Sequence, residues 1–276
     1  MNILQAGRYQ LDLSRPLIMG VVNVTPNSFS DGGRLATSHA AVAHALNLRE
    51  QGADIVDIGG ESTRPGAAVV EQEEEWRRIS PVLEALVAAD VPVSVDTRKP
   101  AVMRAAIEAG AAMINDVQAL RAPGALETVA RGNVAVCLMH MQGQPRNMQE
   151  QPVYDDVVAE VRSILAIRVE ACEKAGIKRD RIVVDPGFGF GKTLDHNLAL
   201  LRHLDSMVEL GLPVLVGISR KTMLGALTGR PVDQREYAGV AANLLALARG
   251  ASIVRVHDVA AMRDALSIWN AVEGER

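Results

Sequence analysis

The feature that most constrains this chain is a regular alternation of short β-branched runs with longer stretches of helical spacing. The short apolar runs occupy residues 17–22, 54–58, 92–95, 112–114, 134–139, 181–184, 213–218 and 252–256. The helical stretches occupy residues 38–51, 71–89, 100–109, 124–131, 155–175, 195–204, 236–248 and 258–272. This alternation predicts βαβ units and a parallel sheet. Because the short runs are apolar at nearly every residue, we expect both faces of the sheet to be covered.

The number of units favours closure of the sheet into a barrel. A (β/α)8 barrel, or TIM barrel, typically has about 250 residues, and this chain has 276. No linker, charge block or low-complexity segment divides the sequence, so we expect residues 1–276 to form a single domain. Residues 1–16 should form a short N-terminal hairpin that plugs the bottom of the barrel. The alternative architecture is an open, doubly wound sheet.

Composition argues against several classes of partner. The formal net charge is -4 and only 3% of residues are aromatic, which does not favour a nucleic-acid surface. No apolar run reaches the ~18 residues of a membrane span, and the N-terminus lacks the pattern of a signal peptide. Cys137 and Cys172 match neither a CxxC motif nor a zinc spacing. We therefore expect reduced thiols in a cytoplasmic protein that contacts neither nucleic acid nor membrane.

Polar side chains follow every predicted strand. In (β/α)8 barrels the active site lies where the strands end and the βα loops begin. A single Asp after a strand is more often a helix cap than a ligand group. Caps alone, however, would not place Lys, Arg, His and amides at equivalent strand ends, so we expect one shared mouth. The residues at these positions are Asn23, Glu61, Thr63, Arg64, Asp96, Asn115, Asp116, His140, Asp185, Ser219, Arg220, Lys221, Arg255 and His257.

These residues divide into a cationic set and a set of acceptors. The cations are Arg64, Arg220, Lys221, Arg255 and His257. Loops seven and eight of such barrels often bind phosphate, and Arg and Lys are suited to that task; the alternative is a set of surface salt bridges. The acceptors are Asp96, Asn115 and Asp185. We therefore predict a flat polar heterocycle held deep in the mouth and an anionic group nearer its rim.

The glycine-rich segment "DPGFGFGKT", residues 185–193, is not a nucleotide fingerprint. A P-loop would require Gly at position 186, where Pro186 stands. The GxGxxG pattern fails as well, because its last position is Lys192. We interpret the segment as a loop whose glycines let the backbone approach a ligand, which Phe188 or Phe190 would cover.

Taken in order, the motifs of this chain resemble those of the dihydropteroate synthase family of folate biosynthesis, from about residue 2 to residue 273. They are "MGVVNVTPNSFSDGG", "DIVDIGGESTRPGA", "SVDTRKP", "MINDV", "DPGFGFGKT", "VGISRK" and "VRVHDV". The resemblance implies a (β/α)8 barrel and a transferase that condenses (7,8-dihydropterin-6-yl)methyl diphosphate with 4-aminobenzoate. It also implies Mg2+ as cofactor, a homodimer and a sulfonamide target.

The resemblance also implies a role for individual residues. The pterin would contact Asp96, Asn115, Asp185 and Lys221. The diphosphate would contact Asn23, Thr63, Arg64, Arg255 and His257, and 4-aminobenzoate would contact Thr63, Pro65, Phe190, Ser219 and Lys221. The catalytic residues would be Lys221, Asp31 and Arg64, with Asn23 at the metal. The chain departs from the family at Asn27, where Asp is common, and at Thr222, where Ser is frequent.

Three other functions compete with this one. A pterin-dependent methyltransferase would share Asp96, Asn115 and Asp185 but has no use for the cationic set. A silent pterin-binding protein would be expected to lack Lys221 or Arg64. A phosphate-binding isomerase or aldolase would need a Schiff-base Lys within a strand or a Glu/His pair, and the sequence offers neither convincingly.

Overall fold

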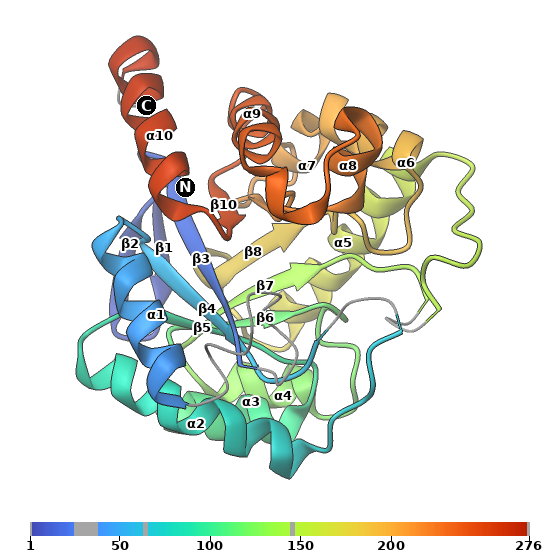
Figure 1. The fold of residues 1–276 in the computed structure, drawn as a ribbon. Coiled ribbons are helices and arrows are strands. Elements are labelled where there is room, and N and C mark those ends of the chain that lie inside the picture. The colour runs from blue at the N-terminus through green and yellow to red at the C-terminus, as the bar shows by residue number, and fades with distance from the viewer. Residues whose placement is uncertain (1, 25–37, 63–65, 144–146, 275–276) are drawn as a thin grey trace.

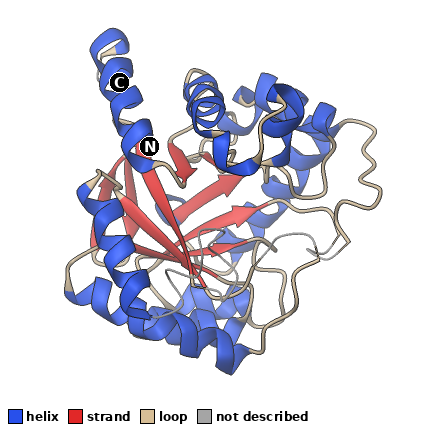
Figure 2. Ribbon diagram, in the orientation of Figure 1, coloured by secondary structure: helices blue, strands red, loops and turns tan. Residues whose placement is uncertain are grey.

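The strands of the protein form a nearly closed parallel barrel surrounded by helices (Figure 1, Figure 2). The computed structural model describes residues 2–24, 38–62, 66–143 and 147–274. Neighbouring strands follow the order β8-β7-β6-β5-β4-β3-β10-β9, and a bridge between Val184 and Val214 joins the two ends. The (β/α)8 prediction is therefore confirmed, and the open sheet is wrong. The strands are β3 (Leu17–Asn23), β4 (Ile55–Gly59), β5 (Val93–Asp96), β6 (Met113–Asp116), β7 (Ala135–Met139), β8 (Ile182–Asp185), β9 (Leu215–Val216) and β10 (Ile253–Val256).

The predicted helices all form, and each end lies within two residues of its predicted position. They are α1 (Ser38–Glu50), α2 (Gln72–Ala88), α3 (Pro100–Glu108), α4 (Ala125–Arg131), α5 (Val157–Lys174), α6 (Leu194–Arg202), α9 (Glu236–Leu247) and α10 (Val259–Glu273). The sequence did not predict α7 (Asp205–Val208), α8 (Thr222–Thr228) or the 3-10 turns η1 (Arg179–Arg181) and η2 (Val232–Gln234). These elements are too short to show a helical period.

The seventh barrel strand is shorter than its predicted range of 213–218. Pro213 has no N–H to donate to a neighbouring strand. Its carbonyl accepts the N–H of Val184 on β8 at 3.0 Å. The ladder with β10 covers only Leu215 and Val216. At Gly217 the chain has left the ladder and reached the mouth of the barrel.

A short antiparallel hairpin closes the amino-terminal end of the barrel, as predicted. It consists of β1 (Ile3–Ala6) and β2 (Tyr9–Asp12). Leu4 and Ala6 are fully buried in the same apolar cluster as residues inside the barrel, among them Met19 and Cys137. The hairpin is thus the floor on which the barrel interior packs.

On four strands of the barrel, the side chains that face the interior change from apolar to polar over two residues. Side chains two residues apart on a strand face the same side. The apolar members lie in the interior cluster above the hairpin, while the residues between them pack outward against the helices. The polar members therefore form the next layer, at the carboxyl end of the barrel. The pairs are Ile55 and Asp57, Met113 and Asn115, Val183 and Asp185, and Ile253 and Arg255.

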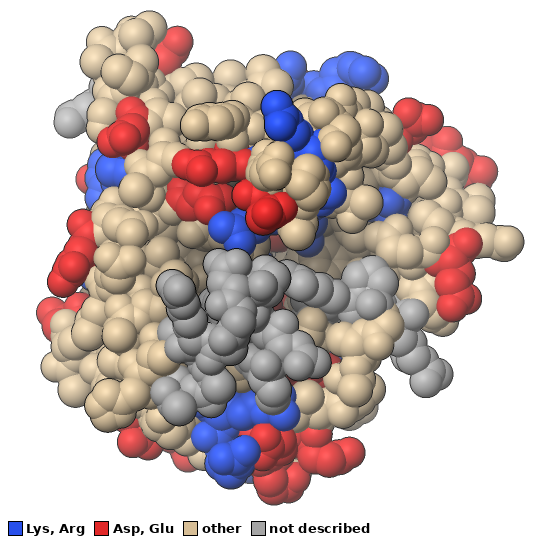
Figure 3. Space-filling model, viewed as in Figure 1, with Lys and Arg blue, Asp and Glu red and all other residues tan. Residues whose placement is uncertain are grey.

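The surface shown in Figure 3 carries acidic and basic side chains close to one another. In the part of the chain that the structure describes, none of the helices combines the length and the apolar character needed to cross a bilayer.

Candidate active site

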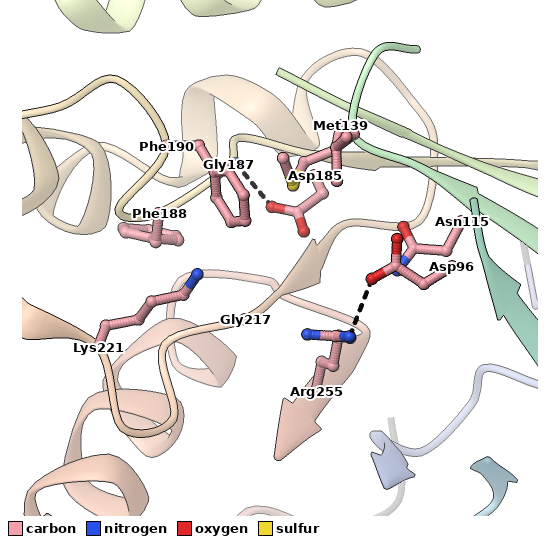
Figure 4. A pocket seen from close by; sticks show the side chains of 11 residues that line it. Asp96, Asn115, Met139, Asp185, Gly187, Phe188, Phe190, Gly217, Lys221 and Arg255 are labelled. Atoms are coloured by element: carbon pink, nitrogen blue, oxygen red, sulfur yellow. Dashed lines mark hydrogen bonds and ion pairs between the residues drawn. The ribbon is translucent and has the colours of Figure 1, made fainter. Parts of the chain in front are cut away.

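A pocket at the carboxyl end of the barrel brings together residues from five strands and three loops (Figure 4). It encloses about 330 Å³, including space open to solvent. Val117, Met139 and Phe188 contribute apolar walls. Six of the predicted site residues thus meet in one place, although what each one binds stays a prediction. They are Asp96, Asn115, Asp185, Phe190, Lys221 and Arg255.

The remaining predicted residues lie around this pocket or outside the described residues. Asn23 ends β3 and is in register with Gly59, which is in turn in register with Asp96. Ser219 and His257 join the loops after β9 and β10, with Ser219 Oγ 3.1 Å from His257 Nδ1. Four predicted residues fall in segments that the structure does not describe: Asp31, Thr63, Arg64 and Pro65.

Arg255 lies at the floor of the pocket between two carboxylates. Its Nε donates to Asp57 Oδ2 at 2.7 Å, and its Nη2 donates to Asp96 Oδ2 at 3.2 Å. Burial alone would lower the pKa of the guanidinium, but the two carboxylates outweigh it and the pKa is raised. From the sequence we predicted that Arg255 belongs to a cationic set opposite the acceptors. The structure instead pairs it with Asp96, which is one of those acceptors.

The pKa values of the two carboxylates that line the pocket, Asp96 and Asp185, are higher than that of an ordinary Asp. Burial raises the pKa of Asp185 to about 6, although the N–H of Gly187 donates to its Oδ1 at 2.7 Å. Burial, together with the charge of Asp57, raises the pKa of Asp96 to about 7 against the opposing effect of Arg255. A ligand that donates hydrogen bonds would favour the ionised form of both groups.

Lys221 and Phe190 contact each other on one side of the pocket. Lys221 Nζ lies 4.0 Å from the centre of the Phe190 ring, a distance suited to a cation–π interaction. Gly189 directly precedes Phe190 and lies beside the Lys221 side chain. Its φ is +77°, and an added Cβ would come within 3.1 Å of Lys221 Cδ. The glycine therefore allows the loop after β8 to approach the lysine closely.

The loop after β8 is anchored by Lys192, which the sequence analysis did not single out. Lys192 is buried, and its Nζ lies 3.0 Å from each of three acceptors: Gly187 O, Phe190 O and His140 Nδ1. Burial lowers the pKa of His140 to about 3, so at neutral pH its ring is neutral and can accept. His140 was predicted to face the mouth, but this contact gives it a structural role behind the pocket.

Other polar strand ends also serve the scaffold. Asp116 accepts the N–H groups of Gln118 and Leu120, both at 2.8 Å, and so holds the turn that follows β6; it is not a helix cap, because α4 begins only at Ala125. Glu61 pairs with Arg98 at 2.8 Å and also contacts Lys99. Arg220 pairs with Asp258 at 2.7 Å.

Asp57 is the other residue that the sequence analysis missed. It is fully buried within β4. The signal was present, because Asp57 follows the apolar Ile55 by two residues, as Asn115 follows Met113. Asp57 lies two residues before the end of β4, so a prediction based on strand ends alone does not include it.

The fold and the pocket together define a class: a (β/α)8-barrel enzyme whose mouth presents buried acceptors, an ammonium group and an aromatic face to a flat polar ligand. Comparison with known proteins specifies that class. The family model described as "Pterin binding enzyme" matches residues 19–257. The dihydropteroate synthase of Neisseria meningitidis serogroup C is 52% identical, over 98% of both chains.

Solved structures agree with this assignment. The Xanthomonas albilineans dihydropteroate synthase with 4-aminobenzoic acid has a TM-score of 0.93 and 58% identity, covering 99% of this chain and 98% of that one. The same enzyme in complex with 7,8-dihydropteroate has a TM-score of 0.90 and 55% identity, covering 99% of each chain. The chain belongs to the dihydropteroate synthase family.

Proposed function

We propose that this protein condenses (7,8-dihydropterin-6-yl)methyl diphosphate with 4-aminobenzoate, giving 7,8-dihydropteroate and diphosphate. The observation that carries the proposal is the pocket in which Asp96, Asn115 and Asp185 face Lys221 and Phe190. The Xanthomonas relatives bind 4-aminobenzoic acid and 7,8-dihydropteroate. They support a site in this chain for the second substrate and for the product.

The acceptors suit the pterin ring. Its pyrimidinone edge presents an N–H and an amino group, which are hydrogen-bond donors. One oxygen of Asp185 is engaged by Gly187, and a carboxylate has capacity for further donors on its other oxygen. Asn115 Oδ1 is buried and has no hydrogen-bond partner among the described residues. These oxygens are our candidates for holding the heterocycle.

The other substrate groups are assigned to the aromatic and cationic residues of the site. For 4-aminobenzoate we propose Phe190, Ser219 and Lys221, with Thr63 and Pro65 from the segment outside the described residues. For the diphosphate we propose Arg255 and His257, with Asn23, Thr63 and Arg64. A guanidinium has five N–H donors, so the pairing of Arg255 with Asp57 and Asp96 is compatible with contact to an anion.

The chemical step is proposed as a dissociative displacement. The C–O bond to diphosphate breaks and leaves positive charge on a carbon conjugated to the pterin. The neutral amine of 4-aminobenzoate then forms the C–N bond and loses a proton to water. The carboxylates of Asp96 and Asp185 would stabilise the positive charge, and Lys221 and Arg64 the departing anion, with Asp31 as the third catalytic candidate. Holding both rings in place would supply the orientation.

We also propose Mg2+ as cofactor. The described residues contain no group of three or more His, Cys, Asp or Glu side chains placed to hold a metal. This fits an ion that is bound by one or two protein oxygens and otherwise by water and substrate phosphates, as is usual for Mg2+. The amide oxygen of Asn23 would be the protein ligand, and the bound ion would neutralise charge on the diphosphate.

The test is an assay of diphosphate release from the pterin diphosphate. Release should require 4-aminobenzoate and Mg2+, should stop with a chelator and should match dihydropteroate formation mole for mole. Release without dihydropteroate, or no turnover with all components present, would refute the proposal. A stable covalent adduct between pterin and enzyme would refute the dissociative step alone.

A homodimer through α9 and α10 is also proposed. These helices contact each other and carry exposed apolar side chains: Tyr237 (85%) and Leu245 (50%) on α9, and Ile268 (69%) and Val272 (75%) on α10. A second copy of the chain would cover them. Sedimentation should show a dimer that Ile268→Glu dissociates, whereas a monomeric wild type would contradict the proposal.

Two remaining expectations concern inhibitors and location. A Yersinia pestis dihydropteroate synthase, 49% identical with a TM-score of 0.95 over 98% of this chain and 99% of that one, is known in complex with a sulfonamide drug. We propose that sulfonamides compete with 4-aminobenzoate here as well, which inhibition kinetics would test. Cys137 and Cys172 are free, buried thiols, in keeping with the predicted cytoplasmic location.

A further inference from the structure

Asp57 lies directly beneath the pocket and contacts two of the residues that line it. Its Oδ2 accepts from Asn115 Nδ2 at 3.3 Å and from Arg255 Nε at 2.7 Å. The side chain is fully buried and does not itself belong to the lining of the pocket. Asp57 therefore acts on a ligand only through the residues above it.

The contact with Asp57 determines which way the amide of Asn115 points. If the amide were flipped, its oxygen would face the Asp57 carboxylate, and two acceptors would oppose each other. The observed orientation leaves Asn115 Oδ1 buried, without a partner among the described residues, in a residue that lines the pocket. A buried acceptor without a partner destabilises the ligand-free protein, and a ligand N–H at this position would remove that cost.

The same carboxylate holds Arg255 from one side while Asp96 holds it from the other. The guanidinium is thereby fixed at the floor of the pocket. Without Asp57, Arg255 would keep a single carboxylate partner among those contacts and Asn115 would lose the charge that orients it.

We infer that Asp57 is a positioning residue for pterin recognition: it turns the carbonyl of Asn115 into the pocket as an acceptor for an N–H of the heterocycle. This inference rests on the proposed function, since it takes the ligand to be a pterin. It adds a residue that the resemblance and the comparisons do not assign.

The experiment measures the affinity for 6-hydroxymethyl-7,8-dihydropterin, which lacks the leaving group, by calorimetry. Asp57→Asn keeps an oxygen that can accept but loses the charge that orients Asn115, and should weaken binding about fivefold to tenfold. In an Asn115→Ala background the same substitution should weaken binding by no more than about twofold, because the amide to be oriented is gone. Equal factors in the two backgrounds, or no effect of Asp57→Asn, would overturn the inference.

A reciprocal exchange provides a rescue. In the double variant Asp57→Asn with Asn115→Asp, the amide at position 57 can donate to the carboxylate at position 115, whose second oxygen still faces the pocket. Affinity should recover to within a few-fold of wild type. If the exchange binds no better than Asp57→Asn alone, the inference is wrong. The exchange also carries the test if Asp57→Asn alone fails to fold.

Asp54→Asn is the matched control. Asp54 precedes β4 and also binds two arginines, Arg15 at 2.7 Å and Arg263 at 2.9 Å, at the opposite end of the strand. This variant should lower the melting temperature and leave pterin affinity unchanged. If the wild type itself does not bind the pterin, the proposed function is refuted. If the wild type binds and only the variants behave otherwise than expected, the inference alone is wrong.

Discussion

The ammonium of Lys221 lies 4.0 Å from the centre of the Phe190 ring, on the side of the pocket formed by the loops after β8 and β9. The ring face attracts the cation, and the close approach requires Gly189 beside the lysine. This contact joins a charge and an aromatic surface at the point where we place both substrates.

Lys221→Ala should therefore weaken binding of both the pterin and 4-aminobenzoate. Loss of a charged hydrogen-bond donor costs about 1.5–3 kcal/mol, or roughly 10- to 150-fold in affinity. Equilibrium binding of each substrate checks this, with Lys174→Ala on the exposed face of α5 as control. A mild effect confined to one substrate would move Lys221 out of the shared position.

Asp185→Asn should weaken pterin binding by about tenfold or more. The substitution replaces one of the two accepting oxygens of the carboxylate by an NH2 group, which donates. The remaining oxygen can still accept the N–H of Gly187. Calorimetry with the pterin measures the effect, and the exposed Asp195→Asn serves as control. Unchanged affinity would remove Asp185 from the pterin site.

Pterin affinity should rise with pH between 6 and 8. Burial and the charge of Asp57 raise the pKa of Asp96 to about 7, with Arg255 opposing and Glu75 and Asp116 adding smaller repulsions. Only the ionised carboxylate can accept with both oxygens, so affinity should increase by up to about tenfold across this range.

The pH dependence is checked by repeating the pterin titration in Asp96→Asn. This variant should lose the step near pH 7 and keep only the step near pH 6 that belongs to Asp185. A wild-type affinity that is flat from pH 6 to 8 would contradict the assignment.

Asp116 should make stability depend on pH in the opposite sense to an ordinary ion-paired carboxylate. Burial raises its pKa to about 6 in the folded state, above the unfolded value of about 3.9. Its contribution to the free energy of unfolding is therefore fully present below pH 4 and is lost as the pH rises through 6.

Urea denaturation of wild type and Asp116→Asn at several pH values measures this contribution. The stability advantage of the wild type should shrink between pH 4 and pH 7, because the amide does not titrate. An advantage that grows over this interval would show that the native structure prefers the ionised form of Asp116.

Lys192→Met should lower the free energy of unfolding by about 1–3 kcal/mol, as expected when buried acceptors lose their hydrogen-bond donor. The variant leaves Gly187 O, Phe190 O and His140 Nδ1 without their common donor. Because Phe190 is then less firmly held, the KM for 4-aminobenzoate should also rise. The exposed Lys178→Met is the control, and unchanged stability would contradict the anchoring role.

The sequence by itself determined the barrel and much of its mouth. Strand and helix periods are local, and the period of two residues sets which side of the sheet each side chain faces. The placement of Asn115 and Asp185 at the carboxyl end of the barrel therefore followed from their positions in β6 and β8. The short helix α8, whose seven residues include Gly225, gave no such local signal.

Only the tertiary structure decided which of these side chains bind one another. Arg255 is 198 residues from Asp57 and 159 from Asp96 along the chain, and Lys192 is 52 residues from His140. Local sequence patterns do not show which residues far apart in the chain come into contact, because these contacts depend on the register in which the barrel closes. In the closed barrel, Arg255 lies among the acceptors, and His140 lies behind the pocket rather than at its mouth.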